Sequence, residues 1–251
     1  MRTDTLTGMT AEVAEGPSAA SVAAAVPGAA LYRLLAWLSP SFPVGAFAYS
    51  SGLEWAVEAG DIRDADSLCR WLRVLVRDGG LFCDAALFGH AHRATMQGDA
   101  AALAETAELA LALAPSAERF LETTTQGKAF VAAVQSAWPC AALAHLPLAP
   151  DGTIAYPIAV AVVTAGHGIA LAPALHAFAH ALVANLISAG VRLVPLGQTD
   201  GQRVLAALEP AVAAACARAE TVPLDAVGSA AFRADLAAMR HETQYTRLFR
   251  S

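Results

Sequence analysis

The longest uncharged stretch of this sequence runs from Gly152 to Val191 and contains no Asp, Glu, Lys or Arg. A bilayer span needs roughly 20 apolar residues, so this stretch is long enough to cross a membrane. Alanine supplies much of its apolar character, however, and no cluster of Lys or Arg marks a cytoplasmic flank. Helix-breaking residues also divide it, at Pro157, Gly166, Gly168 and Pro173. We therefore expect two helices buried in a core or a dimer interface; a small integral membrane protein, such as a metal permease component, is the alternative.

The remainder of the chain also favours helices. Hydrophobic residues make up 56% of the 251 residues and charged residues 15%, so a sizeable core can form. Runs such as Ala100–Ala114 are rich in strong helix formers, and no stretch shows the alternation of a half-buried strand. The sequence predicts an all-α fold, a single-domain helical bundle of about ten helices.

The charge of the chain bears on its partners. A surface with few charges is often covered in part by other proteins. The net charge of −6 and the pI of about 5.6 argue against nucleic acid, because phosphate binding needs a basic patch. The composition therefore favours protein partners.

We expect the chain to have three parts. Residues 1–29 have the composition of a disordered N-terminal extension, and their acidic residues and weak hydrophobicity do not fit a signal peptide. Residues 30–239 should form the helical domain, and residues 240–251 should form a C-terminal tail. The first helix should place four leucines on one face: Leu31, Leu34, Leu35 and Leu38.

Several helix boundaries can be predicted from capping residues. Asp64 or Asp66 can cap the amphipathic helix that follows them. Thr199 should begin a later helix, with Gln202 reaching back to close a capping box. The last helix should cover Ser229–Met239.

Sequence motifs for catalysis are absent. The chain has no nucleotide-binding P-loop, dinucleotide fingerprint, nucleophile elbow or His-Glu-x-x-His motif. His176 and His180 lie four residues apart on one helix face, with His167 one helix upstream, so a His-based metal-dependent enzyme is an alternative. No Cys or carboxylate lies nearby to complete the ligand shell, and we expect packing or hydrogen bonding instead. Glu54 and Glu58 are interpreted as carboxylates on a solvated helix face.

Two segments have patterns that do not belong to catalysis. In Ser39–Trp55, Pro40, Pro43 and Gly45 fix an unusual loop. Pro195–Gln202 reads as a turn that leads into a capped helix.

The C-terminal residues form a third such segment. Three arginines there accompany Tyr245, Leu248 and Phe249. Arginine and aromatic residues dominate the hot spots of protein interfaces. From these residues alone, partner binding and packing of the segment on its own domain are equally supported.

These three segments resemble motifs of the UreF family of urease accessory proteins. Leu38–Glu54 (LSPSFPVGAFAYSSGLE) is similar to the family's opening signature, and Pro195–Gln202 (PLGQTDGQ) to its P-L-G-Q-T-x-G-Q segment. Arg240–Ser251 resembles its closing H-E-x-x-x-x-R-L-F-x-S motif. Weaker family features fall at Glu118-Arg119, Gln126-Gly127 and Tyr156-Pro157. Around Tyr156 the chain departs from the family, because Ala155 and Ala161 stand in the places of a His and a Phe-Gly pair that many relatives carry.

The resemblance implies an all-helical, usually dimeric scaffold of the cytoplasm that is not an enzyme. UreF-type proteins bind a UreD-type partner (UreH in some naming) and a UreG-type GTPase. The assembly docks on urease apoprotein, supports nickel insertion and modulates GTP hydrolysis. No cofactor is expected on this chain itself, because nickel and GTP are handled by the partner complex.

The resemblance also implies which residues bind partners. The tail should engage the UreD-type protein, and Tyr49 and Arg250 should serve docking of the GTPase. The expected partner-binding residues are Phe47, Tyr49, Glu54, Arg240, Tyr245, Arg247, Leu248, Phe249 and Arg250.

Overall fold

A computed structural model describes residues 26–251, which contain ten α-helices and no strand. This confirms the predicted all-α class. The helices are α1 (Gly28–Trp37), α2 (Leu53–Glu58), α3 (Ala65–Asp78), α4 (Gly80–Gln97), α5 (Ala100–Ala112), α6 (Ala117–Ala137), α7 (Tyr156–Gly166), α8 (Leu171–Leu193), α9 (Gln198–Ala219) and α10 (Phe232–His241). Short 3-10 turns occur at Ala46–Ala48, Ala141–His145 and Leu224–Ala226.

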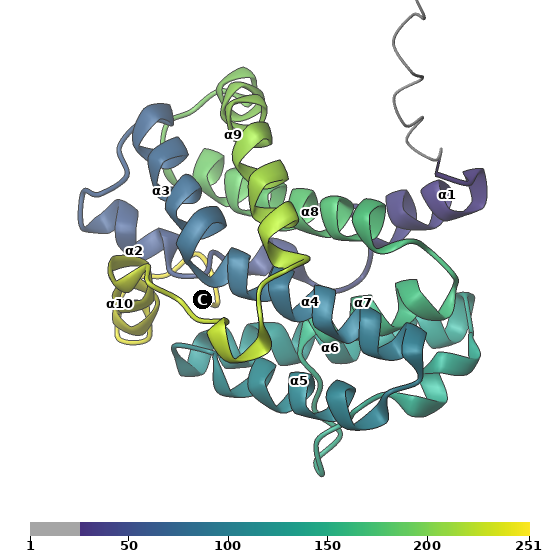
Figure 1. The fold of residues 1–251 in the computed structure, drawn as a ribbon. Coiled ribbons are helices and arrows are strands. Elements are labelled where there is room, and N and C mark those ends of the chain that lie inside the picture. The colour runs from purple at the N-terminus through teal and green to yellow at the C-terminus, as the bar shows by residue number, and fades with distance from the viewer. Residues whose placement is uncertain (1–25) are drawn as a thin grey trace, which may run out of the picture.

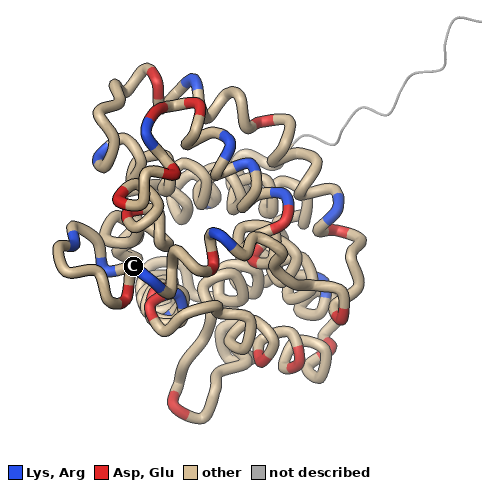
Figure 2. The backbone as a smooth tube through the Cα atoms, turned by 90° about the vertical axis from the view of Figure 1, so that its left-hand side faces the viewer, with Lys and Arg blue, Asp and Glu red and all other residues tan. Residues whose placement is uncertain are grey.

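Helix α7 forms the centre of the core and packs between α4 and α6 (Figure 1). Its residues from Tyr156 to Ala165 are all buried. Charged residues lie mainly on the outer helices and loops, as Figure 2 shows. The uncharged stretch thus folds as predicted, into two helices, and the first of them is enclosed on every side.

Helix α8 is the second half of that stretch. By length and composition, it is the one helix within residues 26–251 that could cross a membrane. Its buried face includes Leu175, Phe178, Val183 and Leu186, and it packs against α4 and α9. Burial of this face explains the apolar composition without a bilayer.

The predicted starts of two helices, α3 and α9, can be compared with the structure. Asp64 caps α3, since its carboxylate accepts the Ser67 N–H at 2.8 Å. Helix α9 begins at Gln198 with Gly197 as its N-cap, two residues before the predicted cap Thr199. The residue that reaches back is Asp200 rather than Gln202. The Asp200 carboxylate accepts the Gly197 N–H at 3.3 Å.

The two ends of the predicted domain also shift. Residues 1–25 lie outside the described residues, and α1 already begins at Gly28, inside the predicted extension. The last helix covers Phe232–His241 instead of Ser229–Met239. It starts later because the Ser229 hydroxyl accepts the Ala231 N–H and so holds residues 229–231 in a turn before the helix. In α1 the buried face is formed by Ala30, Leu34 and Trp37, while Leu31 and Leu35 are exposed.

Candidate partner-binding site

The residues after α10 fold back onto the loop that precedes α2. We call residues 242–251 the C-terminal segment. The Arg250 N–H donates to the Ala48 carbonyl at 2.8 Å, and the Ser50 N–H donates to the main-chain oxygen of Ser251 at 2.7 Å. The first and third sequence motifs, which are far apart along the chain, therefore meet at one edge of the fold (Figure 1).

Glu54 is the main anchor of the C-terminal segment. Its side chain is buried, and its two oxygens accept the N–H groups of Leu248 at 2.7 Å and Phe249 at 3.0 Å. The expectation of a solvated Glu54 was wrong. The expectation rested on the spacing of residues within α2, which is a local signal. The residues that bury Glu54 lie almost two hundred positions later in the chain.

His241 lies between two carboxylates from different helices. Its Nε2 is 3.0 Å from Glu54 Oε2, and its Nδ1 is 2.5 Å from Glu118 Oε2. Arg247 donates to the other oxygen of Glu118 at 2.6 Å. The imidazole is fully buried, and this cluster joins α2, α6, α10 and the C-terminal segment, with Arg247 exposed at its edge.

Glu122 of α6 holds the last residue of the segment. It accepts the Ser251 hydroxyl at 2.7 Å and pairs with Arg119 at 2.5 Å. Ser51, which has a left-handed φ of 55°, donates to the same carboxylate and accepts from Arg119. Glu54, Glu118 and Glu122 together form what we call the carboxylate cluster.

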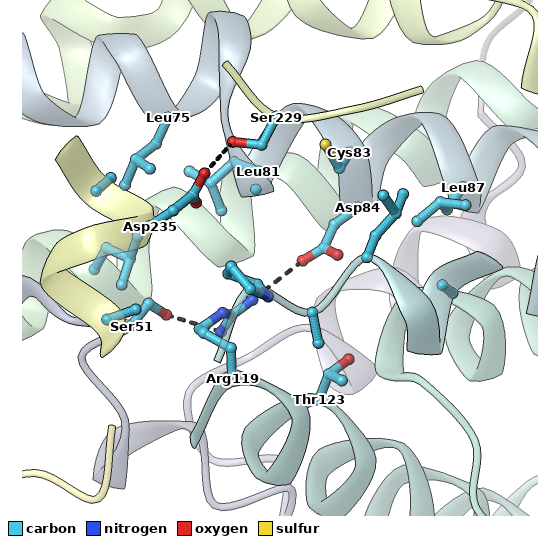
Figure 3. A pocket seen from close by; sticks show the side chains of 18 residues that line it. Ser51, Leu75, Leu81, Cys83, Asp84, Leu87, Arg119, Thr123, Ser229 and Asp235 are labelled. Atoms are coloured by element: carbon cyan, nitrogen blue, oxygen red, sulfur yellow. Dashed lines mark hydrogen bonds and ion pairs between the residues drawn. The ribbon is translucent and has the colours of Figure 1, made fainter. Parts of the chain in front are cut away.

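Two cavities lie beside Arg119. The smaller, of about 60 Å³, is shown in Figure 3, where Arg119 points towards Asp84 and Ser51. The larger, of about 200 Å³, is bounded by the loop before α2 and by α8. Asp84 lines both cavities, and burial raises the pKa of its carboxyl to about 6 against the opposing effect of Arg119.

We predict that Asp84→Asn stabilises the protein above pH 6. In the unfolded chain this carboxyl titrates near 3.8. Between that pH and about 6 the folded chain binds more protons, so the free energy of unfolding falls as pH rises through the window. At neutral pH the variant should gain about 1–3 kcal/mol, since a shift of one unit corresponds to about 1.4 kcal/mol.

Urea titrations across this pH range would measure the effect. Asp225→Asn, at an exposed aspartate, is the control. Well below pH 3.8 the Asp84 carboxyl is neutral in both the folded and the unfolded chain, so Asp84→Asn and the wild type should converge. Equal stabilities at neutral pH would show that the Arg119 pair offsets the cost of burying Asp84.

Gly52 allows α2 and α10 to approach closely. It has a φ of 80°, and a Cβ at this position would lie 2.6 Å from the Ala238 nitrogen. Both the backbone conformation and the contact require glycine. The opening motif therefore sets the position of the helix that leads into the C-terminal segment.

Arg192 connects the same region to α8. Its guanidinium lies over the ring of Phe47 at 3.7 Å and over the ring of Phe249 at 4.3 Å. Such cation–π contacts contribute about 0.5–2 kcal/mol. Arg192 thus links the loop, the C-terminal segment and the end of α8, three residues before the second motif begins.

The nine expected partner-binding residues divide into two groups. Tyr49, Glu54 and Phe249 are buried and hold the site together, so in this structure they do not face a partner. The other six are exposed: Phe47, Arg240, Tyr245, Arg247, Leu248 and Arg250.

The histidine candidates for a metal site are not brought together. His176 and His180 are exposed on α8, and Nδ1 of His176 contacts the Ala172 carbonyl of its own helix at 2.9 Å. His167 accepts from Arg33 and donates to the Trp138 carbonyl, each at 3.1 Å, and burial lowers its pKa. Within residues 26–251 no three His, Cys, Asp or Glu side chains are placed to hold a metal ion.

Sequence reasoning missed several residues of the site. Asp84 and Glu122 were not singled out, nor was Arg192. Asp84 offered a signal, because it is the only charged residue between Gly79 and His92. A lone carboxylate in an apolar helix needs a buried partner, and here that partner is Arg119.

Comparison with known proteins identifies the family. A sequence model of UreF matches residues 62–209 of the chain. The urease accessory protein UreF of Rhodopseudomonas palustris (strain BisB5) is 61% identical over 242 residues, which are 96% of this chain and 99% of that protein. The chain belongs to the UreF family. This confirms the resemblance inferred from the three motifs.

Other relatives in the UreF family are equally similar. The urease accessory protein UreF of Bradyrhizobium sp. (strain ORS 278) is 62% identical over 223 residues, 89% of this chain and 92% of its own. That of Bradyrhizobium diazoefficiens is 58% identical over 228 residues, 91% of this chain and 94% of its own. These names describe accessory proteins, in agreement with the prediction that the chain is not an enzyme.

Proposed function

We propose that this chain is a non-catalytic scaffold of urease maturation in the cytoplasm. It binds a UreD-type (UreH-type) protein, recruits a UreG-type GTPase and docks on urease apoprotein as a homodimer. In that assembly it modulates GTP hydrolysis while nickel is inserted. The support is membership of the UreF family together with an exposed surface of suitable chemistry.

That surface is the observation that carries the proposal. Helix α10 exposes Phe232 (72%), Leu236 (58%) and Met239 (47%) at successive turns of one face. The C-terminal segment adds Tyr245, which is fully exposed, and Leu248, which is 77% exposed. We call these five residues the α10–tail surface. Large apolar patches of this kind mark protein interaction sites, and Arg240, Arg247 and Arg250 nearby supply hot-spot chemistry.

Nickel and GTP are assigned to the partners. The missing P-loop supports this assignment for GTP, since cradling its phosphates needs such a loop or an equivalent. For nickel we propose that the chain positions the partners that carry the ion, without contributing a ligand set of its own.

The double variant Tyr245→Ala/Leu248→Ala tests the proposal. Both side chains are exposed, so the melting temperature should stay unchanged, while the affinity for the UreD-type partner should fall about tenfold or more. The control is Met96→Ala/Leu148→Ala, which removes two exposed apolar side chains outside the α10–tail surface.

Partner capture should be combined with complementation. Cells carrying a urease operon without its UreF-type gene should regain nickel-loaded urease with the wild type and the control pair, but not with the double variant. Unchanged capture by the double variant would reject the assigned surface. Failure of the wild type to restore urease, when expressed and soluble beside its own partners, would reject the scaffold function.

A further inference from the structure

We infer that the larger cavity beside Arg119, of about 200 Å³, binds a small organic ammonium ion with Asp84 as its counterion. The cavity lies among the loop before α2 and helices α4, α6 and α8, and every residue that lines it precedes residue 189. The inference therefore depends neither on the C-terminal segment nor on the proposed function, to which it adds a ligand site.

The wall of this cavity carries more negative than positive charge. Asp84 and Glu122 both line it, and Arg119 is the one Lys or Arg among its described lining residues. The Arg119 guanidinium lies 2.5 Å from Glu122 and donates to the Ser51 hydroxyl at 2.9 Å. Its distance from the Asp84 carboxylate is 3.6 Å. One guanidinium thus serves two carboxylates and pairs closely with Glu122, so a second cation beside Asp84 would balance the charge.

Asp84 is the carboxylate without a close partner. The ion pair with Arg119, drawn in Figure 3, is the one polar contact of its carboxylate within residues 26–251. At 3.6 Å this contact is longer than a charge-assisted hydrogen bond, which spans about 2.7–2.9 Å. The side chain keeps 19% exposure and lines both cavities, so a ligand can reach it. A donor placed in the larger cavity would remove the cost of leaving this carboxylate without a hydrogen bond.

The remaining wall favours an organic cation over a metal ion. The described part of the chain holds no set of three His, Cys, Asp or Glu side chains that could bind a metal. Apolar side chains from three segments line the cavity: Leu38, Phe42, Val44, Leu81, Leu182 and Leu186. An alkylammonium ion has N–H donors at one end for a carboxylate and an apolar end that suits such walls. The volume admits several non-hydrogen atoms, since one water molecule takes up about 30 Å³ in the liquid.

Binding of an ammonium ion requires the ionised form of Asp84. Burial raises the pKa of this carboxyl to about 6, so it is mostly charged at pH 7 and mostly neutral at pH 5. The other titratable or charged groups around the two cavities are Cys83 on α4, Arg119 and Glu122 on α6, Tyr156 on α7, His180 on α8 and Asp235 on α10. Burial raises the pKa of Cys83 and of Tyr156, so both stay neutral in this range. An alkylamine keeps its proton as lysine does, and the affinity should therefore fall as pH falls through 6.

Titration of the full chain with n-butylammonium chloride, followed by nuclear magnetic resonance at constant ionic strength, tests the inference. We expect saturable binding at pH 7 that weakens about tenfold at pH 5, in proportion to the ionised fraction of Asp84. The neutral analogue 1-butanol has the same chain length but no charge. It should bind about tenfold more weakly or less, because hydrogen bonds to charged groups are the stronger ones.

Three variants assign the site to its residues. Asp84→Asn should lower the affinity at pH 7 about tenfold or more and remove the pH dependence, whereas Asp225→Asn, at an exposed aspartate, should change neither. Ala184→Leu enlarges a side chain that lines the cavity, so it should block binding while Asp84 is retained. His180→Gln should keep the pH dependence, which separates the exposed imidazole at the cavity from Asp84.

Several results would overturn the inference. These are an absence of saturable binding, equal affinities of Asp84→Asn and the wild type, and equal affinities for 1-butanol and n-butylammonium. Displacement of n-butylammonium by an equal concentration of Mg²⁺ would also overturn it, because the cavity would then hold a hydrated inorganic cation. No partner protein is present in these titrations, so their outcome is separate from failure of the scaffold proposal.

Discussion

Replacing Glu54 with alanine is expected to lower the free energy of unfolding by about 3–5 kcal/mol and to free the C-terminal segment, because a buried charged acceptor is removed. Two main-chain N–H groups and the His241 ring lose their acceptor together, and the ring and the Phe249 N–H lie in buried contacts. Urea unfolding followed by circular dichroism would measure the loss.

The matched control for this change is Glu58→Ala, one turn later on the same helix. Glu58 is exposed, so its removal should cost less than about 0.5 kcal/mol. Partner capture should also fall for Glu54→Ala, although Glu54 is not on the surface, because Leu248 would lose its fixed position. Equal stabilities of the two variants would mean that Glu54 does not anchor the segment.

Gly52→Ala should be the second most damaging change, with an expected loss of about 2–4 kcal/mol. The new methyl group would lie 2.6 Å and 2.7 Å from the main-chain nitrogen and Cα of Ala238, and a backbone cannot move aside as a side chain can. The left-handed φ adds about 1 kcal/mol or more for any residue with a Cβ. Thermal unfolding would report the total.

Gly60→Ala separates these two costs. Gly60 has a similar φ of 77° but open space around its missing Cβ, so only the conformational cost applies. We expect Gly52→Ala to lose clearly more stability than Gly60→Ala and to weaken partner capture, since α10 is pushed away from α2. Similar losses for the two variants would show that α10 adjusts freely and that the close approach has no special role.

The sequence indicated the helices well because their signals are local. Asp64 at the start of α3 acts within a few residues, and it marks the boundary that the structure has. The N-cap of α9 was misplaced by two residues because Thr199 and Gly197 are both acceptable capping residues. The choice depended on Asp200, which reaches back to Gly197.

The site was harder to predict because its contacts are distant along the chain. The tail motif suggested an interface, but the sequence could not show that Phe249 turns inward while Leu248 turns outward. Glu54 was assigned to solvent for the same reason, since nothing within α2 reveals the N–H groups that later cover it. Arg192 had no signal at all, because its partners are two aromatic rings from different segments.

The distance between the two halves of the site also has a consequence for synthesis. On a translating ribosome, Glu54 emerges long before Leu248, which follows it by 194 positions. Until residues 241–251 appear, the carboxylate cluster has neither its imidazole nor the N–H groups of the segment, and it must remain hydrated. An unfinished chain therefore cannot present the α10–tail surface in its final form.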